Sequence, residues 1–479
     1  MEERAREFAS KARALVVAAA GCGKTELIAK AVASGPPERQ LILTHTHAGV
    51  RALRDRLSKM RVPSSACRVE TLDGFALRYA AAFPKTSGCT VTEPSQSCDW
   101  IAVREACRRA LENRRVEHVF TQSYAGFYVD EYQDCTRSQH RLVLRLAQLR
   151  PCRVVGDPMQ AVFGFEQDDP LPSWESEVAT QFERLPDLTE PHRWLKDGAN
   201  RDLGDWLARV RRDLSCASWS LSFTNGAPVN WVHRTGDDLN DQRGACFRLN
   251  KSCGKETVVA IHNHASQQHR VAKALGGCYQ SIEEVEGKDL LKHCGFLGDS
   301  IGIERARRVV DAACQCVVRM PKQLQAVKVA LAKGRIPTRG KVASDCAHLL
   351  AALQAVAAGH EYLPVADCLD LVSHMPGVAL YRRELMTDMR KTCRLHDCAS
   401  GDSLRQTAWK VRDAARRYGR HLYRRVVART LLVKGLEFDH AVVLDADGIR
   451  NPKDLYVALT RSSRSLTIVS RSPTLAGSQ

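Results

Sequence analysis

A glycine turn followed by a lysine and a threonine lies near the start of the chain, where residues 21–25 read GCGKT. A strand-like apolar run (14–18) precedes this turn, and a helix with apolar periodicity follows it. The backbone N–H groups of such a turn and of the helix N-terminus can hold phosphate oxygens. Lys24 would place a compact positive charge on the phosphates, and the Thr25 hydroxyl would ligate Mg²⁺. The spacing therefore predicts a phosphate-binding loop.

Two adjacent carboxylates, Asp130 and Glu131, end a second apolar run at residues 127–129. Asp130 is suited to holding Mg²⁺ through its water shell, and Glu131 to orienting and deprotonating an attacking water. Adjacent acids are often only solvated surface. Here they follow a strand-like run and lie downstream of a phosphate-binding loop, so the two motifs together predict nucleotide hydrolysis.

These motifs need strands and helices to position them, and the sequence predicts such elements along most of its length. Strand-like runs lie at residues 41–43, 127–129, 154–155, 258–261, 426–427, 441–444 and 466–469. Helical patterns separate many of the runs, and this alternation indicates parallel α/β sheets with buried strands. Residues 78–118 and 290–420 are instead helix-like throughout. Two helical insertions are therefore expected to interrupt the α/β pattern.

Composition limits the class of protein. The 479 residues include 71 Lys and Arg against 54 Asp and Glu, a net charge of +17 that favours polyanions, and nucleic acid first among them. The ordinary reading of such charge is a solvated surface. With 44% hydrophobic residues, wholesale disorder is excluded. The sequence has neither a membrane-length apolar run nor a secretory leader, and its 18 cysteines form no CxxC pair. We expect reduced thiols, no membrane partner, and a cytoplasmic protein, or a nuclear one if the source is eukaryotic or viral.

Several motifs in sequence order resemble those of the UvrD/Rep/PcrA-like superfamily 1 DNA helicases. VDEYQD at 129–134 and GDPMQAVFGF at 156–165 resemble motifs II and III, KGLEFD at 434–439 resembles motif V, and LYVALTR at 455–461 resembles motif VI. The likeness runs from residue 14 to residue 470. It implies an α/β fold in which two RecA-like domains clamp ATP between them, each interrupted by a helical insertion. The implied domains are 1A (1–77 and 119–185), 1B (78–118), 2A (186–289 and 421–479) and 2B (290–420).

The resemblance also implies roles around ATP and Mg²⁺. Gln160 would sense the γ-phosphate, and Arg193 and Arg461 would reach it from domain 2A as arginine fingers, which neutralise charge on the transferring group. The implied catalytic residues are Lys24, Asp130, Glu131, Gln160, Arg193 and Arg461. Thr25 and Asp130 would hold Mg²⁺. The implied nucleotide contacts are Ala20, Gly21, Cys22, Gly23, Lys24, Thr25, Glu26, Gly435 and Glu437, of which Glu437 would bond the ribose.

Nucleic-acid contacts are implied at two further motifs and at two aromatic residues. The expected partners are single-stranded and duplex DNA. Stacking on aromatic rings suits sequence-independent tracking, because every base has a π-face. Ordinary turn residues remain the alternative for the two histidines, and core packing for the two phenylalanines. The implied contacts are Thr44, His45, Thr46, His47, Thr71, Asp73, Phe163 and Phe165.

This chain departs from the family pattern in several places. Residues 1–13 contain no glutamine to recognise adenine, so base selectivity is expected to be loose or to come from His192 or Trp194. The strict loop motif has glycine where Ala18 stands. Cys22 lies at a helix N-terminus near Lys24, a setting that can lower a thiol pKa. Alkylation of Cys22 is then expected to block ATP hydrolysis, unless the residue is there only because it is small.

The length of the chain bears on its place in the family. The chain ends at Gln479, close after Arg461, so we expect no C-terminal nuclease domain. The compact build, VDEYQD and TLDGF (71–75) also resemble the helicase-like subunit of the Gabija antiphage defence system, which works beside a separate nuclease. A phage, viral or mobile-element replication helicase and a reduced repair helicase are alternatives. We expect an ATP-dependent single-stranded DNA translocase or helicase of 3′–5′ polarity. The alternative is a DNA-activated ATPase switch that licenses a partner nuclease with little unwinding.

Overall fold

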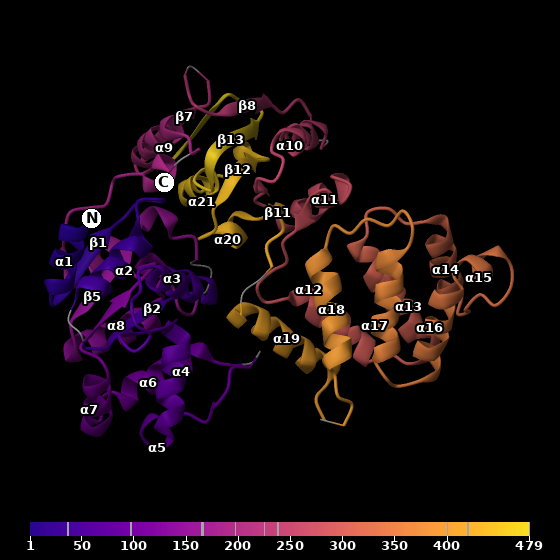
Figure 1. Cartoon of the computed structure of the whole chain (residues 1–479), viewed down its shortest axis with the longest axis horizontal. Coiled ribbons are helices and arrows are strands. Elements are labelled where there is room, and N and C mark those ends of the chain that lie inside the picture. Colours follow the sequence, from indigo (N-terminus) through magenta and orange to yellow (C-terminus); the bar gives the residue numbers. More distant parts are fainter. Residues whose placement is uncertain are drawn as a thin grey trace.

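The computed structural model describes residues 1–35, 38–95, 98–163, 167–196, 198–224, 226–236, 239–399, 401–418 and 421–478. Figure 1 shows two α/β domains beside each other, with a helical bundle extending away from them. We call these the first sheet domain (1–185), the second sheet domain (201–281 and 425–478) and the bundle (288–418). None of the helices in the described ranges is long and apolar enough to cross a membrane.

The first sheet domain is built on a six-stranded sheet in the order β3-β2-β4-β5-β1-β6, and its pairings are parallel. Successive residues of a strand point to opposite faces. In β1, Leu15 packs into one core with Phe75 and Leu142, while Val16 packs into another with Leu27. The sheet is therefore buried on both faces. Its strands are β1 (Arg13–Val17), β2 (Gln40–Thr44), β3 (Cys67–Thr71), β4 (Gly126–Val129), β5 (Cys152–Gly156) and β6 (Glu183–Arg184).

Helices cover this sheet on its two faces. One face carries α1 (Glu2–Ser10), α2 (Lys24–Ser34) and α3 (His47–Lys59); the other carries α4 (Leu72–Ala82) and α8 (Arg137–Leu149). Between β3 and β4 lie also α5 (Pro84–Ser87), α6 (Trp100–Ala110) and α7 (Arg114–Ser123). Cys107 of α6 and Phe120 of α7 pack into the same core as Phe75 of α4. These helices thus extend the core of the first sheet domain, and the insertion boundaries at 78 and 118 stay a prediction.

The second sheet domain repeats this architecture. Its six-stranded sheet has the order β10-β11-β9-β12-β13-β8, with parallel pairings, and β7 pairs with β14 in a separate antiparallel ribbon. The strands are β7 (Ser218–Ser222), β8 (Asn230–His233), β9 (Val258–Ile261), β10 (Gln280–Ser281), β11 (Arg425–Ala428), β12 (Phe438–Val443), β13 (Ser462–Ser470) and β14 (Thr474–Ser478). Its helices are α9 (Arg201–Leu214), α10 (Asn240–Ser252), α11 (Ala265–Ala274), α20 (Thr430–Val433) and α21 (Pro452–Leu459).

Every strand-like run predicted from the sequence falls on a strand, so the α/β fold with two parallel sheets is confirmed. The runs were recognisable because a strand that is buried on both faces must be apolar throughout. Short helical turns connect the strands at residues 132–134, 158–160, 174–178, 179–181, 192–195 and 446–448.

The bundle is inserted between the neighbouring strands β10 and β11. It has a core of its own, with no residue from either sheet in its cluster of buried side chains. Its last helix crosses toward the first sheet domain and contacts α3 (Figure 1). Its helices are α12 (Lys288–Gly298), α13 (Gly302–Cys316), α14 (Lys322–Ala332), α15 (Lys341–Asp345), α16 (Ala347–Ala358), α17 (Leu363–His374), α18 (Arg383–Leu395) and α19 (Leu404–Tyr418).

A buried arginine fastens the bundle to the second sheet. Arg382, at the start of α18, donates to both carboxylate oxygens of Glu283, at 2.8 and 2.5 Å, and also pairs with Asp289 of α12. Glu283 follows β10 directly, and the side chains of Arg382 and Glu283 are only 5% and 7% exposed. Burial raises the pKa of Glu283, an effect that the Arg382 guanidinium opposes. The junction therefore depends on this bidentate pair.

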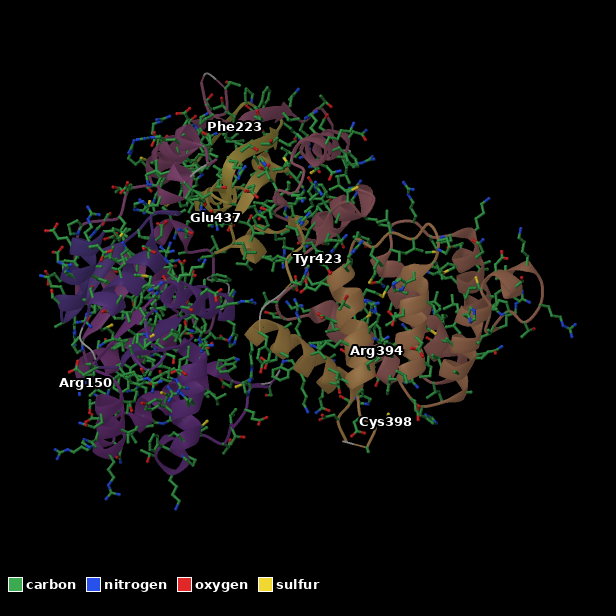
Figure 2. The ribbon with its side chains drawn as sticks, viewed as in Figure 1. Arg150, Phe223, Arg394, Cys398, Tyr423 and Glu437 are labelled. Atoms are coloured by element: carbon green, nitrogen blue, oxygen red, sulfur yellow. The ribbon has the colours of Figure 1, made fainter. Side chains whose placement is uncertain are left out.

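Removing the guanidinium should weaken this junction. We expect Arg382→Ala to lower the free energy of unfolding by about 3–5 kcal/mol, because Glu283 stays buried without its guanidinium. Arg394→Ala is the matched control (Figure 2): Arg394 is 53% exposed in its pair with Asp370, and its loss should cost less than about 1 kcal/mol. Urea unfolding of both variants measures the difference. Equal losses would contradict the role given to Arg382.

Candidate active site at the junction of the two sheets

The GCGKT turn lies between β1 and α2, as a phosphate-binding loop requires. Gly21 and Gly23 have φ values of +72° and +90°, a region in which a side chain would be strained. The whole turn is described, and the N–H groups of residues 23–25 donate to no protein acceptor there. Together they form a nest of free donors that an anion can occupy.

Lys24 and the two acids meet at the ends of β1 and β4. The Lys24 Nζ is 3.7 Å from the Glu131 Oε2, and the Lys24 side chain is only 10% exposed. Asp130 is buried at the end of β4, and its Oδ1 accepts the N–H of Glu131 at 2.9 Å. Glu131 has a φ of +54°, a left-handed conformation that is uncommon outside glycine. Strained backbone of this kind is concentrated at functional sites, where surrounding contacts enforce it.

The two carboxylates differ in their affinity for protons. Burial, reinforced by the charge of Glu131, raises the pKa of Asp130 to about 7. Burial acts in the same direction on Glu131, but the charges of Lys24 and Lys434 outweigh it and lower the pKa of Glu131. At neutral pH Glu131 therefore carries a negative charge, and a cation close to Asp130 would stabilise the ionised form of that residue.

A chain of hydrogen bonds connects Glu131 to the predicted γ-phosphate sensor, Gln160. The Gln133 Nε2 donates to the Glu131 Oε2 at 2.5 Å, and the Gln133 Oε1 accepts the N–H of Asp157 at 2.9 Å. The Gln160 Nε2 in turn donates to the Asp157 Oδ2 at 2.9 Å. Arg211 of α9, from the second sheet domain, binds the other oxygen of fully buried Asp157 at 2.8 Å. Asp157 thus connects a residue of the second sheet domain with Gln133 and Gln160 of the first.

Arg193 lies directly beside the phosphate-binding loop. Its backbone N–H donates to the Gly21 carbonyl at 3.1 Å, and its Nη1 donates to the Thr460 carbonyl at 2.6 Å. Its guanidinium also pairs with Glu437 at 3.0 Å. Figure 2 shows Glu437 where the first sheet domain meets the second. The structure therefore brings both predicted residues, Arg193 and Glu437, to this junction.

Arg461 is almost completely buried, with 1% of its surface exposed. Its guanidinium donates to the Val457 and Leu436 carbonyls at 2.7 and 3.2 Å, and to the Thr460 Oγ1 at 2.8 Å. Burial, and after it the charge of Arg193, lowers the pKa of Arg461 to about 9, so it stays positive at neutral pH. Among the described residues its bonded partners are neutral oxygens, and an anion would balance its charge.

Trp194 packs against the loop instead of facing solvent. A Cβ at Gly21 would lie 2.7 Å from its ring, and one at Gly204 would lie 2.7 Å from the Trp194 Cβ, so both positions need glycine. Trp194 is 2% exposed. It is therefore not placed to stack on a base, which corrects the suggestion that it supplies base selectivity. His192 remains partly exposed beside Gly23.

Two predicted nucleotide contacts have other surroundings. The Glu26 carboxylate pairs with Arg56 of α3 and lies 3.6 Å from the Lys30 Nζ. Gly435 has a φ of +77° in the turn between α20 and β12, where a side chain would meet no neighbour but would strain the backbone. Their direct contact with nucleotide stays a prediction.

The three predicted threonines have local roles in the fold. Thr44 is buried at the end of β2. The hydroxyls of Thr46 and Thr71 accept the N–H groups of Gly49 and Gly74, each at 3.0 Å, and so cap the first turns of α3 and α4. The caps fix where these two helices begin, directly after two neighbouring strands.

Asp73 pairs with a buried arginine, although its own side chain is 31% exposed. Arg104 of α6 holds its two carboxylate oxygens at 2.7 and 3.0 Å, and the Gln139 Nε2 donates to it at 3.1 Å. Arg104 is itself buried and also pairs with Asp169 at 3.0 Å. Asp73 thus holds α6 beside α4, and its contact with nucleic acid stays a prediction.

The two predicted histidines lie in different environments. The His45 Nε2 is 3.3 Å from the Cys135 Sγ, and burial lowers the pKa of His45 to about 4, so the ring is neutral at pH 7. His47 starts α3, and burial together with the charges of Arg416 and Arg417 on α19 lowers its pKa. His47 therefore lies in a positive region that two distant segments of the chain build together.

Phe163 lies beneath a lysine from the second sheet domain. The Lys434 Nζ is 4.7 Å from the centre of its ring, within the range of a cation–π contact. Phe165, the other predicted stacking residue, lies outside the described residues.

Three residues at the junction were not predicted as site residues. The Tyr456 hydroxyl accepts the N–H of Ala20 at 3.2 Å, Arg211 binds Asp157, and Lys434 reaches the acidic motif. Tyr456 and Lys434 stand inside motifs that the sequence revealed, so motif membership was the available signal. Arg211 stands among other arginines on α9, and its spacing gives no sign of which one is buried.

The environment of Cys22 corrects the expectation of a reactive thiol. Cys22 is 2% exposed, and burial raises its pKa to about 11, although Lys24 acts against this. We expect iodoacetamide at pH 8 to modify Cys22 at least about tenfold more slowly than the exposed Cys398 (Figure 2), because the thiolate is the nucleophile. Mass spectrometry of time-resolved digests measures both rates. Equal labelling would show that Cys22 is accessible and ionised.

Comparisons with known proteins give one family. Residues 91–171 match the UvrD/REP helicase N-terminal domain. No curated protein matches this sequence.

Solved structures that match this chain include the Pif1 helicase from Candida albicans (12% identity, 100% of this chain and 96% of that one, TM-score 0.42). They also include the Bacteroides Pif1 helicase in complex with ADP-AlF3 and ssDNA (9%, 98% and 91%, 0.41) and Arterivirus nonstructural protein 10, a helicase, with DNA (11%, 98% and 63%, 0.35). The chain spans about 63% of that arterivirus protein. Over residues 91–171 the chain is therefore similar to the UvrD/REP helicase N-terminal domain.

Proposed function

We propose that this protein is an ATP-dependent motor that moves along single-stranded DNA and separates duplex DNA. The observation that carries the proposal is the convergence of four residues at one junction: Lys24 and Glu131 from the first sheet domain, Arg193 from the segment that connects the two domains, and Arg461 from the second. A triphosphate held there would be contacted from both sides. Its cleavage would then change what holds the two sheets together.

The residues at the loop fit a nucleoside triphosphate with Mg²⁺. The free N–H groups of residues 23–25 and the Lys24 ammonium would hold the phosphates. The Thr25 hydroxyl and the Asp130 carboxylate are oxygen donors of the kind that Mg²⁺ prefers. Asp130 is buried and forms no ion pair with any described residue, so its charge is left for a cation. A bound Mg²⁺ would neutralise charge on the phosphates.

Glu131 is the residue suited to act on the attacking water. Its pKa is lowered, so it is ionised at neutral pH and can accept a proton from water that is aligned for attack. Its left-handed backbone and the hydrogen bond from Gln133 fix the direction of the carboxylate. Arg461 and Arg193 would face the phosphates from the other side and stabilise the charge of the transition state.

The charged residues where α3 contacts α19 support nucleic acid as the polymer along which the protein moves. Arg51 of α3 donates to the Tyr418 carbonyl of α19 at 3.1 Å, and His47 faces Arg416 and Arg417. Asp413 pairs with Arg417 at 2.7 Å and balances part of this charge, and a phosphate backbone could neutralise the rest in a salt-dependent way. The net charge of +17 fits this reading. The 3′–5′ polarity is the one that the family resemblance implies.

Substitutions at the loop and at the acid pair test the hydrolysis. We expect Lys24→Ala to abolish steady-state ATP hydrolysis, and Glu131→Gln to lower kcat by about 100-fold or more with little change in ATP affinity. Lys30→Ala is the matched control, since Lys30 stands on the same helix and pairs with Glu2 and Glu26. If the Lys24→Ala variant hydrolysed ATP at the wild-type rate, the proposed function would be wrong.

Strand displacement tests the motor. We expect ATP-dependent unwinding of a duplex with a 3′ single-stranded tail and little unwinding with a 5′ tail, measured with a fluorescent strand. Raising the salt concentration should weaken DNA binding steeply. If DNA stimulates ATP hydrolysis but the protein neither displaces a strand nor translocates, the motor is ruled out and a nucleic-acid-activated ATPase switch is the better description.

A further inference from the structure

Lys434 belongs to the second sheet domain, but its ammonium lies in the first. It follows α20 in the chain, and its Nζ is 2.5 and 2.6 Å from the two carboxylate oxygens of Asp134. The Nζ also donates to the Gln160 carbonyl and lies over the ring of Phe163. The side chains of Lys434 and Asp134 are 6% and 4% exposed. This is a buried ion pair that crosses the junction.

The atoms that Lys434 binds belong to the loops of the hydrolytic site. Asp134 ends the short helical turn that begins directly after Glu131, and Gln160 ends the turn after β5. One ammonium therefore holds both loops at once. It also touches Phe163, which is predicted to stack on bases, so it lies between the nucleotide side and the nucleic-acid side.

The charges around this pair make it sensitive to separation of the domains. Asp134, Glu131 and Lys24 face it from the first sheet domain, and Asp454 of α21 lies near it in the second. Burial raises the pKa of Asp134 to about 7, an effect that Lys434 opposes. If the sheets moved apart, Asp134 would lose the cation that balances it in a desolvated position. The Lys434–Asp134 ion pair thus has two states, formed and broken. It can couple the nucleotide site to the nucleic-acid site if ligands at both sites favour the same state.

We propose that Lys434 is a positioning residue that couples nucleic-acid contact at Phe163 to hydrolysis at Glu131, by holding Asp134 and the Gln160 carbonyl across the junction. The inference rests on the proposed function and adds a route by which DNA stimulates hydrolysis. Among the described residues Lys434 forms no hydrogen bond or ion pair with the phosphate-binding loop or with Glu131, although its charge helps to lower the pKa of Glu131. Its loss should therefore act on kcat more than on the KM for ATP.

The test compares ATP hydrolysis with and without an oligothymidylate for Lys434→Met, Lys434→Arg, Asp134→Asn and the double variant Lys434→Met/Asp134→Asn. We expect Lys434→Met and Asp134→Asn each to reduce the ratio of DNA-stimulated to basal rate by about fivefold or more, with a smaller change in the KM for ATP. Lys434→Arg should recover part of the ratio. The ratio for the double variant should be no lower than the lower of the two single-variant ratios, because the two single variants and the double variant all remove the same contact.

Lys410→Met is the control, since Lys410 forms an exposed pair with Asp402 and its loss should leave the ratio unchanged. The double variant also removes the stranded charge, so it reports on coupling even if a single variant folds poorly. An unchanged ratio in Lys434→Met, or additive losses in the double variant, would overturn the inference while the proposed function stands. A wild-type enzyme that hydrolyses ATP without any stimulation by DNA would overturn both.

Discussion

Asp134 and Asp157 are almost completely buried on the first sheet domain, and each receives its cation from the second. A buried carboxylate is tolerated only with a well-placed partner, so neither loop is stable in this form unless Lys434 and Arg211 are present. The conformation of the two loops therefore depends on the relative position of the two sheets. The strained backbone of Glu131 lies at the start of one of these loops, where the contacts on both sides can enforce a conformation that the residue alone would avoid.

This constraint also explains why the phosphate-binding loop is so closely covered. The loop leaves its N–H groups open for an anion, but Gly21 is packed against Trp194 and Arg193 from the segment that leads into the second domain, and Gly23 lies near His192 of the same segment. Small residues at these positions serve two needs at once, since they allow the left-handed turn and the close approach of the ring. The nucleotide site and the domain junction are built from the same few atoms.

The sequence was sufficient for the elements and for much of the site. Strands that are buried on both faces are apolar throughout, and the phosphate-binding loop and the acid pair are local patterns. The strands and these two motifs can therefore be recognised from the sequence alone. Partners from distant segments were not visible. Trp194 and Cys22 are buried by residues far away in the chain, and Arg211 resembles its neighbours on α9. The sequence did not reveal which of these side chains are buried, because burial depends on tertiary packing and a local pattern contains no information about it.

The position of the bundle has a consequence for the order of folding. Strands β10 and β11 are neighbours in the second sheet, yet the whole of residues 288–418 separates them in the chain. Closing so long a loop is entropically unfavourable and slows the pairing of strands. The bundle has its own core, and its first and last helices, α12 and α19, pack against each other. A bundle that folds first would bring its two ends together and present the two strands side by side, so that completing the sheet becomes a local event.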